Sequence, residues 1–163
     1  MYQPEPIVKK FYDGLDEGIF LGRKCPDCGS IEFPPVPVCN KCGKLETEWV
    51  TTSGEVIIDE VYKVLPAFVS PEFNRYLPLF CAEASMEGGS EFSCVIFGVT
   101  DENYIEVRDS VPLKGNLVVM PHQGEFNSFA VSINGAVPNP NTDSDIVNEE
   151  YVKFIINMDQ KQD

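Results

Sequence analysis

The feature that most restricts how this chain can fold is a pair of cysteine motifs near its N-terminus. Cys25-Pro-Asp-Cys28 and Cys39-Asn-Lys-Cys42 are separated by ten residues, and a glycine follows each motif. Two cysteines at this spacing lie on one tight turn and can bind one metal ion, and the glycine permits the positive φ that such a turn favours. Two such turns supply four thiolates and leave no open position for a substrate. The pattern therefore predicts a closed tetrahedral site of the kind that holds structural Zn²⁺.

The same cysteines are open to two further interpretations. An iron site of the rubredoxin type uses the same four ligands, so the sequence leaves both metals open and favours zinc. Two disulfide bonds are not expected, because a chain in a reducing compartment keeps its thiols. Cys81 and Cys94 lie in strand-like segments, and we expect them to be small buried residues.

The chain is strongly acidic, with 12 lysine and arginine residues against 26 aspartate and glutamate residues and a formal net charge of −14. A protein that grips nucleic acid must present clustered basic side chains to the phosphates. The charge therefore argues against a nucleic-acid partner. Most of the acidity lies after Trp49, so the segment before it, with its lysines and Arg23, is the region expected to meet an anion.

The chain length and its apolar runs restrict the class of protein further. The 163 residues suffice for one domain with its own hydrophobic core, or for a domain with a small appendage. The apolar runs are far shorter than the roughly 20 residues that span a bilayer, so no membrane segment is expected. The first residues lack the basic start and apolar stretch of a secretion signal. We therefore expect a cytoplasmic protein.

After Trp49 the sequence changes to strand-like segments separated by turns. Five segments have the composition of β-strands: 54–64, 77–86, 92–99, 115–120 and 126–133. A turn at 87–91 with two glycines predicts a hairpin between the second and third segments. No helix alternates with the strands. The sequence thus predicts a mainly β chain with a five-stranded antiparallel barrel of the oligonucleotide/oligosaccharide-binding (OB) type, with a small sandwich as the alternative.

Three segments outside these strands carry apolar side chains that need a surface to cover them. Residues 5–19 have apolar residues at helical spacing and predict a short N-terminal helix, which needs the ribbon, the main domain or another chain to pack against. The same spacing from Val147 to Met158 predicts an amphipathic C-terminal helix. The connection 65–76 contains three aromatic residues, and connections of this length are often functional.

The order of these parts resembles the acyl-CoA-associated family that joins a rubredoxin-like zinc ribbon to an OB-fold barrel. The resemblance covers about residues 5–135 and rests on the two cysteine motifs with Phe33-Pro34-Pro35 between them, followed by Trp49-Val50 and Ser53-Gly54. This combination is more specific than one zinc knuckle. Members are accessory subunits of thiolase-like or lipid-transfer-protein-like enzymes, such as benzoylsuccinyl-CoA thiolase. The tail after Pro140 departs from the usual end of the family.

The resemblance implies a non-catalytic subunit of a cytoplasmic thiolase-type acyl-CoA enzyme, which supports assembly and the passage used by CoA. The thiolase-like partner would supply the catalytic cysteine and histidines, and a CoA thioester would be the ligand of the complex. We divide the chain into an N-terminal helix, a zinc ribbon, an OB-fold domain and a C-terminal tail with a helix, at residues 1–22, 23–50, 51–138 and 139–163.

The predicted metal ligands are the four ribbon cysteines. Candidates for contact with CoA or with the partner are basic residues of the ribbon and aromatic residues of the helix, ribbon and connection: Arg23, Lys24, Lys41, Lys44, Phe11, Tyr12, Phe33, Phe68, Phe73 and Tyr76. The alternative role of the basic residues is to solubilise the ribbon, and that of the aromatic residues in the connection is packing.

Residue chemistry agrees with a chain that has no catalytic residues of its own. A thiolase-type reaction needs a nucleophilic thiolate and a base that activates it. The ribbon cysteines are committed to metal, and His122 is the one histidine, so a dyad with Cys81 is the remaining arrangement; both residues lie in ordinary strand and turn contexts. Two other functions stay open: an OB-fold nucleic-acid-binding module, which the charge opposes, and an electron carrier with iron on the four cysteines.

Overall fold

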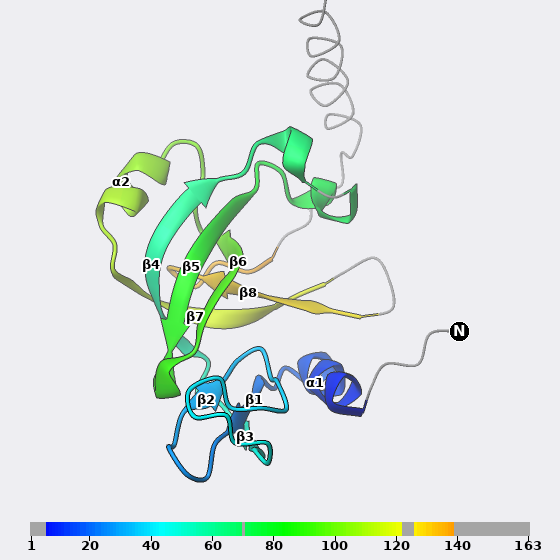
Figure 1. Cartoon of the computed structure of the whole chain (residues 1–163). Coiled ribbons are helices and arrows are strands. Elements are labelled where there is room, and N and C mark those ends of the chain that lie inside the picture. Colours follow the sequence, from blue (N-terminus) through cyan, green and yellow to red (C-terminus); the bar gives the residue numbers. More distant parts are fainter. Residues whose placement is uncertain (1–5, 70, 122–125, 139–163) are drawn as a thin grey trace, which may run out of the picture.

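The computed structural model describes residues 6–69, 71–121 and 126–138. A short helix and a small ribbon sheet lie together at one end of the molecule, and a barrel stands beyond them (Figure 1). None of the helices within these ranges has the length and hydrophobicity needed to span a membrane.

The ribbon is a three-stranded antiparallel sheet. Strand β1 (Leu21–Lys24) lies between β2 (Ile31–Glu32) and β3 (Glu48–Thr51). Each cysteine motif leaves the sheet as a tight turn, and the glycine after each has positive φ, 73° at Gly29 and 77° at Gly43. The predicted role of these glycines is thus confirmed.

The barrel consists of the five strands that the sequence predicts. Their bounds are β4 (Glu55–Lys63), β5 (Phe80–Met86), β6 (Glu91–Phe97), β7 (Leu113–Met120) and β8 (Ser128–Ser132). They pair in the order β4-β5-β6-β8-β7, and β7 pairs back with β4 to close the barrel. All pairs are antiparallel except β6 with β8. A closed five-stranded barrel of this kind confirms the OB-type prediction, and the sandwich alternative is wrong.

Strand β4 is the longest strand of the barrel, and it pairs with both β5 and β7. Residues 55–58 pair with β7, whereas the pairing with β5 runs from residue 56 to residue 63. A register shift between Ile58 and Glu60 marks a β-bulge, which bends a strand and increases its twist. Val56, Ile58 and Val61 point into the barrel and are buried. The bulge therefore lets one strand follow the curved wall while its apolar residues stay inside.

Two helices accompany these sheets. Helix α1 (Pro6–Asp16) is the predicted N-terminal helix, and it packs on its own chain through the buried side chains of Phe11 and Leu15. Helix α2 (Tyr104–Asp109) lies between β6 and β7 and buries Val107. The sequence analysis missed α2, because six residues are too few to show an apolar period. The predicted C-terminal helix lies outside the described residues.

One aromatic cluster joins the helix, the ribbon and the barrel. Phe33, in the ribbon, has its ring centroid 5.8 Å from that of Phe11 in α1, 5.2 Å from Phe92 in β6 and 5.0 Å from Phe129 in β8. The rings meet edge to face, the arrangement that aromatic quadrupoles prefer. The three parts therefore share a core and are fixed relative to one another.

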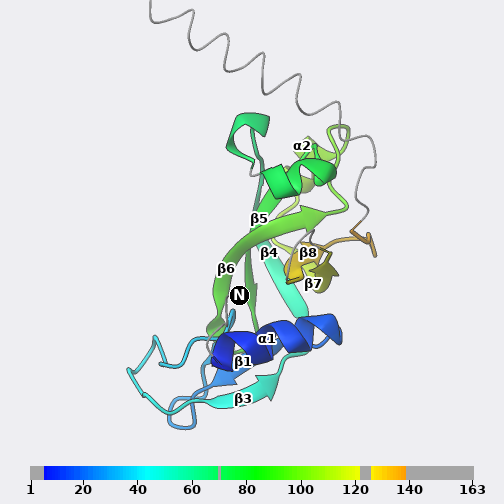
Figure 2. The same ribbon diagram turned by 90° about the vertical axis from the view of Figure 1, so that its right-hand side faces the viewer.

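The opposite end of the barrel carries a second, smaller apolar cluster. Its buried members are Tyr76, Leu79, Met120 and Ala130. The connection between β4 and β5 crosses this end in two 3-10 turns, well away from the ribbon (Figure 2). We call the apolar side chains exposed or half-buried on this connection the apolar end: Val64, Leu65, Phe68, Val69, Phe73 and Leu77.

Candidate metal centre

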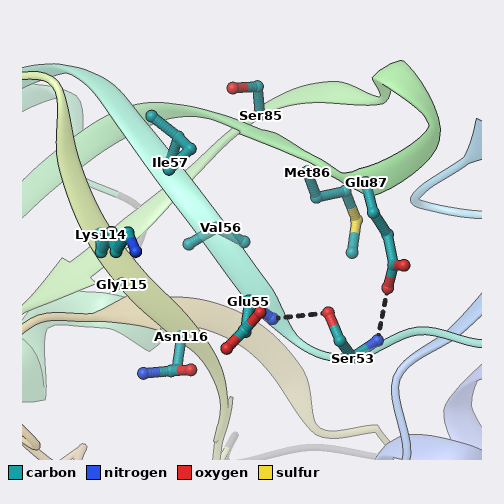
Figure 3. Close-up of a pocket in the computed structure, with 10 residues that line it drawn as sticks. All are labelled: Ser53, Glu55, Val56, Ile57, Ser85, Met86, Glu87, Lys114, Gly115 and Asn116. Carbon is teal, nitrogen blue, oxygen red and sulfur yellow. Dashed lines mark hydrogen bonds between the residues drawn. The ribbon is translucent and has the colours of Figure 1, made fainter.

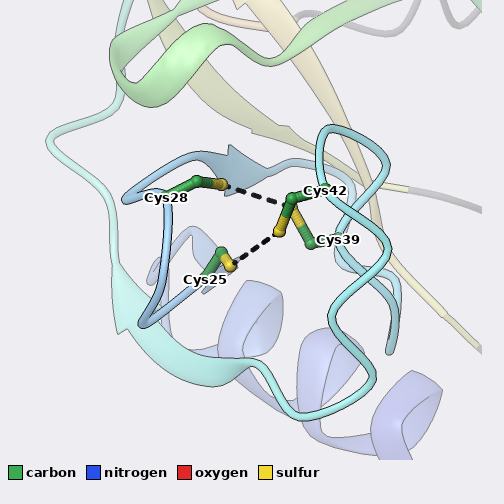
Figure 4. Close-up of side chains that lie close together, drawn as sticks. All are labelled: Cys25, Cys28, Cys39 and Cys42. Carbon is green, nitrogen blue, oxygen red and sulfur yellow. Dashed lines mark hydrogen bonds between the residues drawn. The ribbon is translucent and has the colours of Figure 1, made fainter.

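The four cysteines of the ribbon meet at one point. Their sulfur atoms all lie within 4.8 Å of one another, with 3.5 Å between those of Cys25 and Cys42 and 3.6 Å between those of Cys28 and Cys39 (Figure 4). A tetrahedron with Zn–S bonds of about 2.3 Å has S–S edges of about 3.8 Å, whereas a disulfide bond measures about 2.05 Å. The sulfurs therefore fit a tetrahedral metal site, and the cysteines are not paired as disulfides.

Each motif contributes one buried and one exposed ligand. Cys25 and Cys39 have no exposed surface, while Cys28 and Cys42 lie at the surface of the ribbon. The N–H groups of the two glycines close each turn by donating to the carbonyl oxygens of Cys25 and Cys39, at 3.0 and 2.8 Å. The backbone thus fixes the two buried ligands, while the residues that carry the other two sulfurs lie at the surface.

Ser30 is a residue of the centre that the sequence analysis missed. Its buried hydroxyl lies 3.1 Å from the sulfur of Cys39 and 3.3 Å from that of Cys28. Its carbonyl oxygen accepts the N–H of Cys25 at 2.8 Å. Ser30 therefore contacts both motifs at once. Its position directly after Gly29 is the one local feature that could have indicated this contact, and it does so only when the closure of the turn is known.

The surroundings of three of the four thiols shift their pKa values in different directions. The Ser30 hydroxyl lowers the pKa of Cys39 to about 6, and Ser30 likewise lowers the pKa of Cys28. The N–H of Lys44 lowers the pKa of Cys42, but the adjacent thiols of Cys25 and Cys39 together raise it to about 12. All four sulfurs must be thiolates to bind a metal. A bound divalent ion balances this charge, and its chemistry in a closed four-sulfur site is structural.

Two of the four candidate basic residues have partners within the ribbon. The Lys44 ammonium lies 3.2 Å from the Asp27 carboxylate, an ion pair that links the two cysteine motifs. The Arg23 guanidinium donates to the hydroxyl of Thr47 at 3.0 Å and to the Thr47 carbonyl, and it stacks over the ring of Trp49. Both side chains thus help hold the ribbon together.

Three of the candidate aromatic residues lie in the interior. Phe11, Phe33 and Tyr76 are 6%, 3% and 7% exposed, and the Tyr76 hydroxyl donates to the carbonyl of Pro121. All three side chains therefore pack inside the described fold, and their contact with CoA or a partner stays a prediction. The segment around Phe33 folds against the barrel and places the ring in the shared core.

The remaining candidates reach the surface at different ends of the molecule. Lys24 and Lys41 are exposed on the ribbon, and Tyr12 is half-buried with its ring 4.7 Å from that of Phe126. At the far end, Phe68 is 75% exposed and Phe73 is half-buried. The structure therefore does not bring the predicted contact residues together into one site.

Two cysteines outside the ribbon have properties of inert thiols. Cys81 and Cys94 are half-buried in β5 and β6, and burial raises the pKa of both, to about 12 for Cys94. A thiol with a raised pKa is a poor nucleophile at neutral pH. His122, the possible base for Cys81, lies outside the described residues.

A groove of about 490 Å³ runs along the outer face of the barrel next to the ribbon (Figure 3). Polar groups at its ribbon end bond to one another: the Ser53 N–H donates to the Glu87 carboxylate at 2.6 Å, and the Glu55 N–H donates to the Ser53 hydroxyl at 3.2 Å. Lys114 lines the other side. No cysteine lines this groove, so it is separate from the metal centre.

The fold and the site define a zinc-ribbon protein whose ribbon is fused to an OB-type barrel. Residues 13–48 match the family model described as ChsH2, rubredoxin-like zinc ribbon domain. This match covers the ribbon, where it supports the resemblance drawn from the sequence and identifies the four cysteines as those of a zinc ribbon.

A curated relative and two solved structures are similar over larger parts of the chain. A DUF35 domain-containing scaffold protein of Methanocaldococcus jannaschii is 27% identical over 89 residues, which cover 53% of this chain and 61% of that protein. The Ltp2-ChsH2(DUF35) aldolase has a TM-score of 0.58 at 14% identity, over 81% of this chain and 98% of that one. A DUF35-family protein of unknown function from Sulfolobus solfataricus has a TM-score of 0.51 at 18% identity, over 79% and 86%. These two structures share the fold.

Proposed function

We propose that this chain is a non-catalytic accessory subunit of an acyl-CoA enzyme complex. The observation that carries the proposal is a closed four-sulfur ribbon fused to an OB-type barrel, a fold shared with the Ltp2-ChsH2(DUF35) aldolase. The curated relative is itself named a scaffold protein, which supports the same role. The finer proposal is a cytoplasmic complex in which a thiolase-like partner performs C–C bond cleavage or acyl transfer on a CoA thioester.

The chemistry of the described residues supports a partner that supplies the reactive groups. A metal held by four sulfurs has no open position at which to activate a water or polarise a carbonyl. The other two cysteines have raised pKa values and are poor nucleophiles. In this proposal the nucleophile, and the hydrogen-bond donors that stabilise the oxyanion formed on the substrate, come from another chain.

The apolar end is the surface that suits such a partner. Leu65 is 56% exposed and Phe68 is 75% exposed, and half-buried apolar side chains surround them. Aromatic side chains that become buried at an interface often carry much of its binding energy. We assign this surface to the catalytic subunit, and the exposed Lys24 and Lys41 of the ribbon to the phosphates of CoA.

Co-expression with a thiolase-like or lipid-transfer-protein-like enzyme from the same genome tests the proposal. We expect the two chains to co-purify, and the mass of the intact complex to give their stoichiometry. Phe68→Ser should weaken the complex about ten-fold or more, as loss of an interface anchor does. Ile105→Ser, which changes a side chain 53% exposed on α2, is the matched control and should leave the complex intact. A monomeric chain beside a fully active neighbour would reject the proposal.

The metal itself is tested by colour and by elemental analysis. Zinc bound by four thiolates is colourless, whereas ferric iron in the same site absorbs visible light. A colourless protein with one zinc per chain is the expected result. A red protein that cycles between two oxidation states would replace the scaffold role with electron transfer.

A further inference from the structure

The tip of the β5–β6 hairpin touches the ribbon directly. Gly88 lies at this tip with φ of +79°, and a Cβ placed there would come within 2.6 Å of the side chain of Ile31 and 2.8 Å of its backbone nitrogen. Only a residue without a side chain allows this approach. The backbone of the hairpin tip thus packs directly against Ile31 of strand β2.

A buried hydrogen bond fastens the same contact. The hydroxyl of Ser90 donates to the carbonyl oxygen of Ile31, and Ser90 is only 6% exposed. The carbonyl of Ser90 in turn accepts the N–H of Met86 at 3.0 Å, which closes the hairpin. Ser90 therefore connects the strand of the ribbon to the turn of the barrel.

The contact between Ser90 and Ile31 leads on to the metal centre. Ser30 precedes Ile31, and its hydroxyl contacts the sulfurs of Cys28 and Cys39 at 3.3 and 3.1 Å. A continuous series of contacts thus runs from two ligands through Ser30 and Ile31 to Ser90. Figure 4 shows the hairpin passing over the side of the ribbon that carries Cys28.

We infer that metal occupancy of the ribbon and the position of the β5–β6 hairpin are coupled through Ser30, Ile31 and Ser90. Strand β2 has two residues and pairs with β1 at two positions, so it has little stability of its own. The cysteine turns hold it in place when metal is bound. Loss of the metal releases β2, and with it the carbonyl that Ser90 binds.

This coupling reaches a surface distant from the sulfurs. Glu87, at the start of the hairpin tip, accepts the Ser53 N–H and lines the groove on the outer face of the barrel. A hairpin released from the ribbon alters the wall of that groove. The ribbon metal is therefore a conformational control on the barrel, and the inference holds whichever partner the chain binds. Because coupling is reciprocal, the hairpin contact also strengthens metal binding.

Hydrogen exchange and zinc affinity test this coupling on the full chain. Ser90→Ala removes the contact, and Ser93→Ala is the matched control. Ser93 lies three residues further on, in β6, and its hydroxyl donates to Glu83 at 2.6 Å on the exposed face. Exchange at residues 84–92 is measured in the zinc-loaded and chelator-treated wild type and in both variants. Zinc affinity is measured by competition with a chromophoric chelator.

In the wild type, we expect chelation to raise exchange at residues 84–92 and to leave the β7–β8 ladder protected. In Ser90→Ala, exchange at 84–92 should be high with zinc bound and should change little on chelation. Its zinc affinity should fall about five-fold, as loss of one buried hydrogen bond implies, while Ser93→Ala behaves as wild type. Equal exchange with and without zinc, equal affinities of the two variants, or loss of protection over the whole barrel on chelation would each overturn the inference.

Discussion

The ribbon and the barrel are two small β structures in one chain, and different forces hold them. Between residues 21 and 51 the buried hydrophobic residues are Cys25, Ile31, Phe33 and Cys39. Two of these four are metal ligands, and Phe33 packs into the core shared with the barrel. The barrel has a closed ladder and an interior filled from every strand. The ribbon therefore depends on its metal and its neighbour, whereas the barrel has a core of its own.

This difference shows how short sheets are stabilised. A three-stranded sheet with strands of two to four residues buries too little apolar surface to offset the entropy of ordering its chain. Metal binding supplies the missing free energy, because the ligands of an unfolded chain are not assembled. The longer strands of the barrel, closed into a cylinder, have no need of it.

The largest expected effect is that of losing the metal, which should unfold the ribbon and leave the barrel folded. In Cys39→Ser, a buried ligand is lost and the free energy of metal binding, on the order of 10 kcal/mol in isolated zinc sites, no longer supports the ribbon. We expect zinc to be absent by elemental analysis and residues 21–51 to exchange their amide hydrogens rapidly. The β7–β8 ladder should stay protected. If Cys39→Ser still bound one zinc per chain and its ribbon stayed protected, the ribbon would not depend on its metal as this comparison holds.

A cavity in the barrel should destabilise the barrel and leave the metal bound. Phe80 is 2% exposed, and Phe80→Ala should lower the free energy of unfolding by about 3–5 kcal/mol through lost burial and the cavity left behind. Zinc content should be unchanged, because the metal ligands lie in the ribbon. Denaturant unfolding with zinc analysis of the folded protein measures both effects. A loss of zinc in this variant would mean that the ribbon depends on the whole barrel core.

A change at the junction should affect both regions by a smaller amount. Phe33→Leu keeps an apolar side chain but removes the edge-to-face contacts with Phe11, Phe92 and Phe129. We expect a loss of about 1–2 kcal/mol in the free energy of unfolding, together with weaker zinc binding. Unfolding curves with and without excess zinc test this. An effect confined to either region would show that the cluster does not couple them.

The smallest expected effect is a pH dependence of stability at the contact between Ser53, which lies between β3 and β4, and Glu87 of the β5–β6 hairpin. The Ser53 N–H stabilises the Glu87 carboxylate and holds the pKa of Glu87 below its ordinary value of 4.5. A lowered pKa in the folded state contributes stability above the unfolded pKa, and this contribution is lost as the pH falls through the folded value. An NMR titration should give a Glu87 midpoint below 4.5, and Glu87→Gln should be slightly less stable at neutral pH. A midpoint at or above 4.5 would contradict the contact.

The parts that the sequence predicted are those that rest on local pattern. The cysteine spacing gives the metal centre, because both ligands of each motif lie on one turn, and segments of β-strand composition separated by turn residues give all five strands of the barrel. Helix α1 follows from its apolar period. These features need no knowledge of what lies across the fold.

The parts that it missed depend on contacts distant in sequence. The burial of Phe33 depends on rings from α1, β6 and β8, and the contact of Ser90 with Ile31 joins residues 59 positions apart. Nothing beside either residue indicates these partners. Helix α2 is too short for periodicity, and the hydroxyl of Ser30 gains its role only when the second cysteine motif closes over it.

Trp49, the single tryptophan of the sequence, lies on β3 where helix and ribbon meet. The Lys10 ammonium of α1 lies 5.1 Å from the centre of its ring, and the Arg23 guanidinium of β1 lies 4.9 Å away. An indole next to two positive charges changes its emission when either one moves. The fluorescence of Trp49 therefore reports whether helix α1 is packed on the ribbon, and it can be measured in dilute solution without an attached dye.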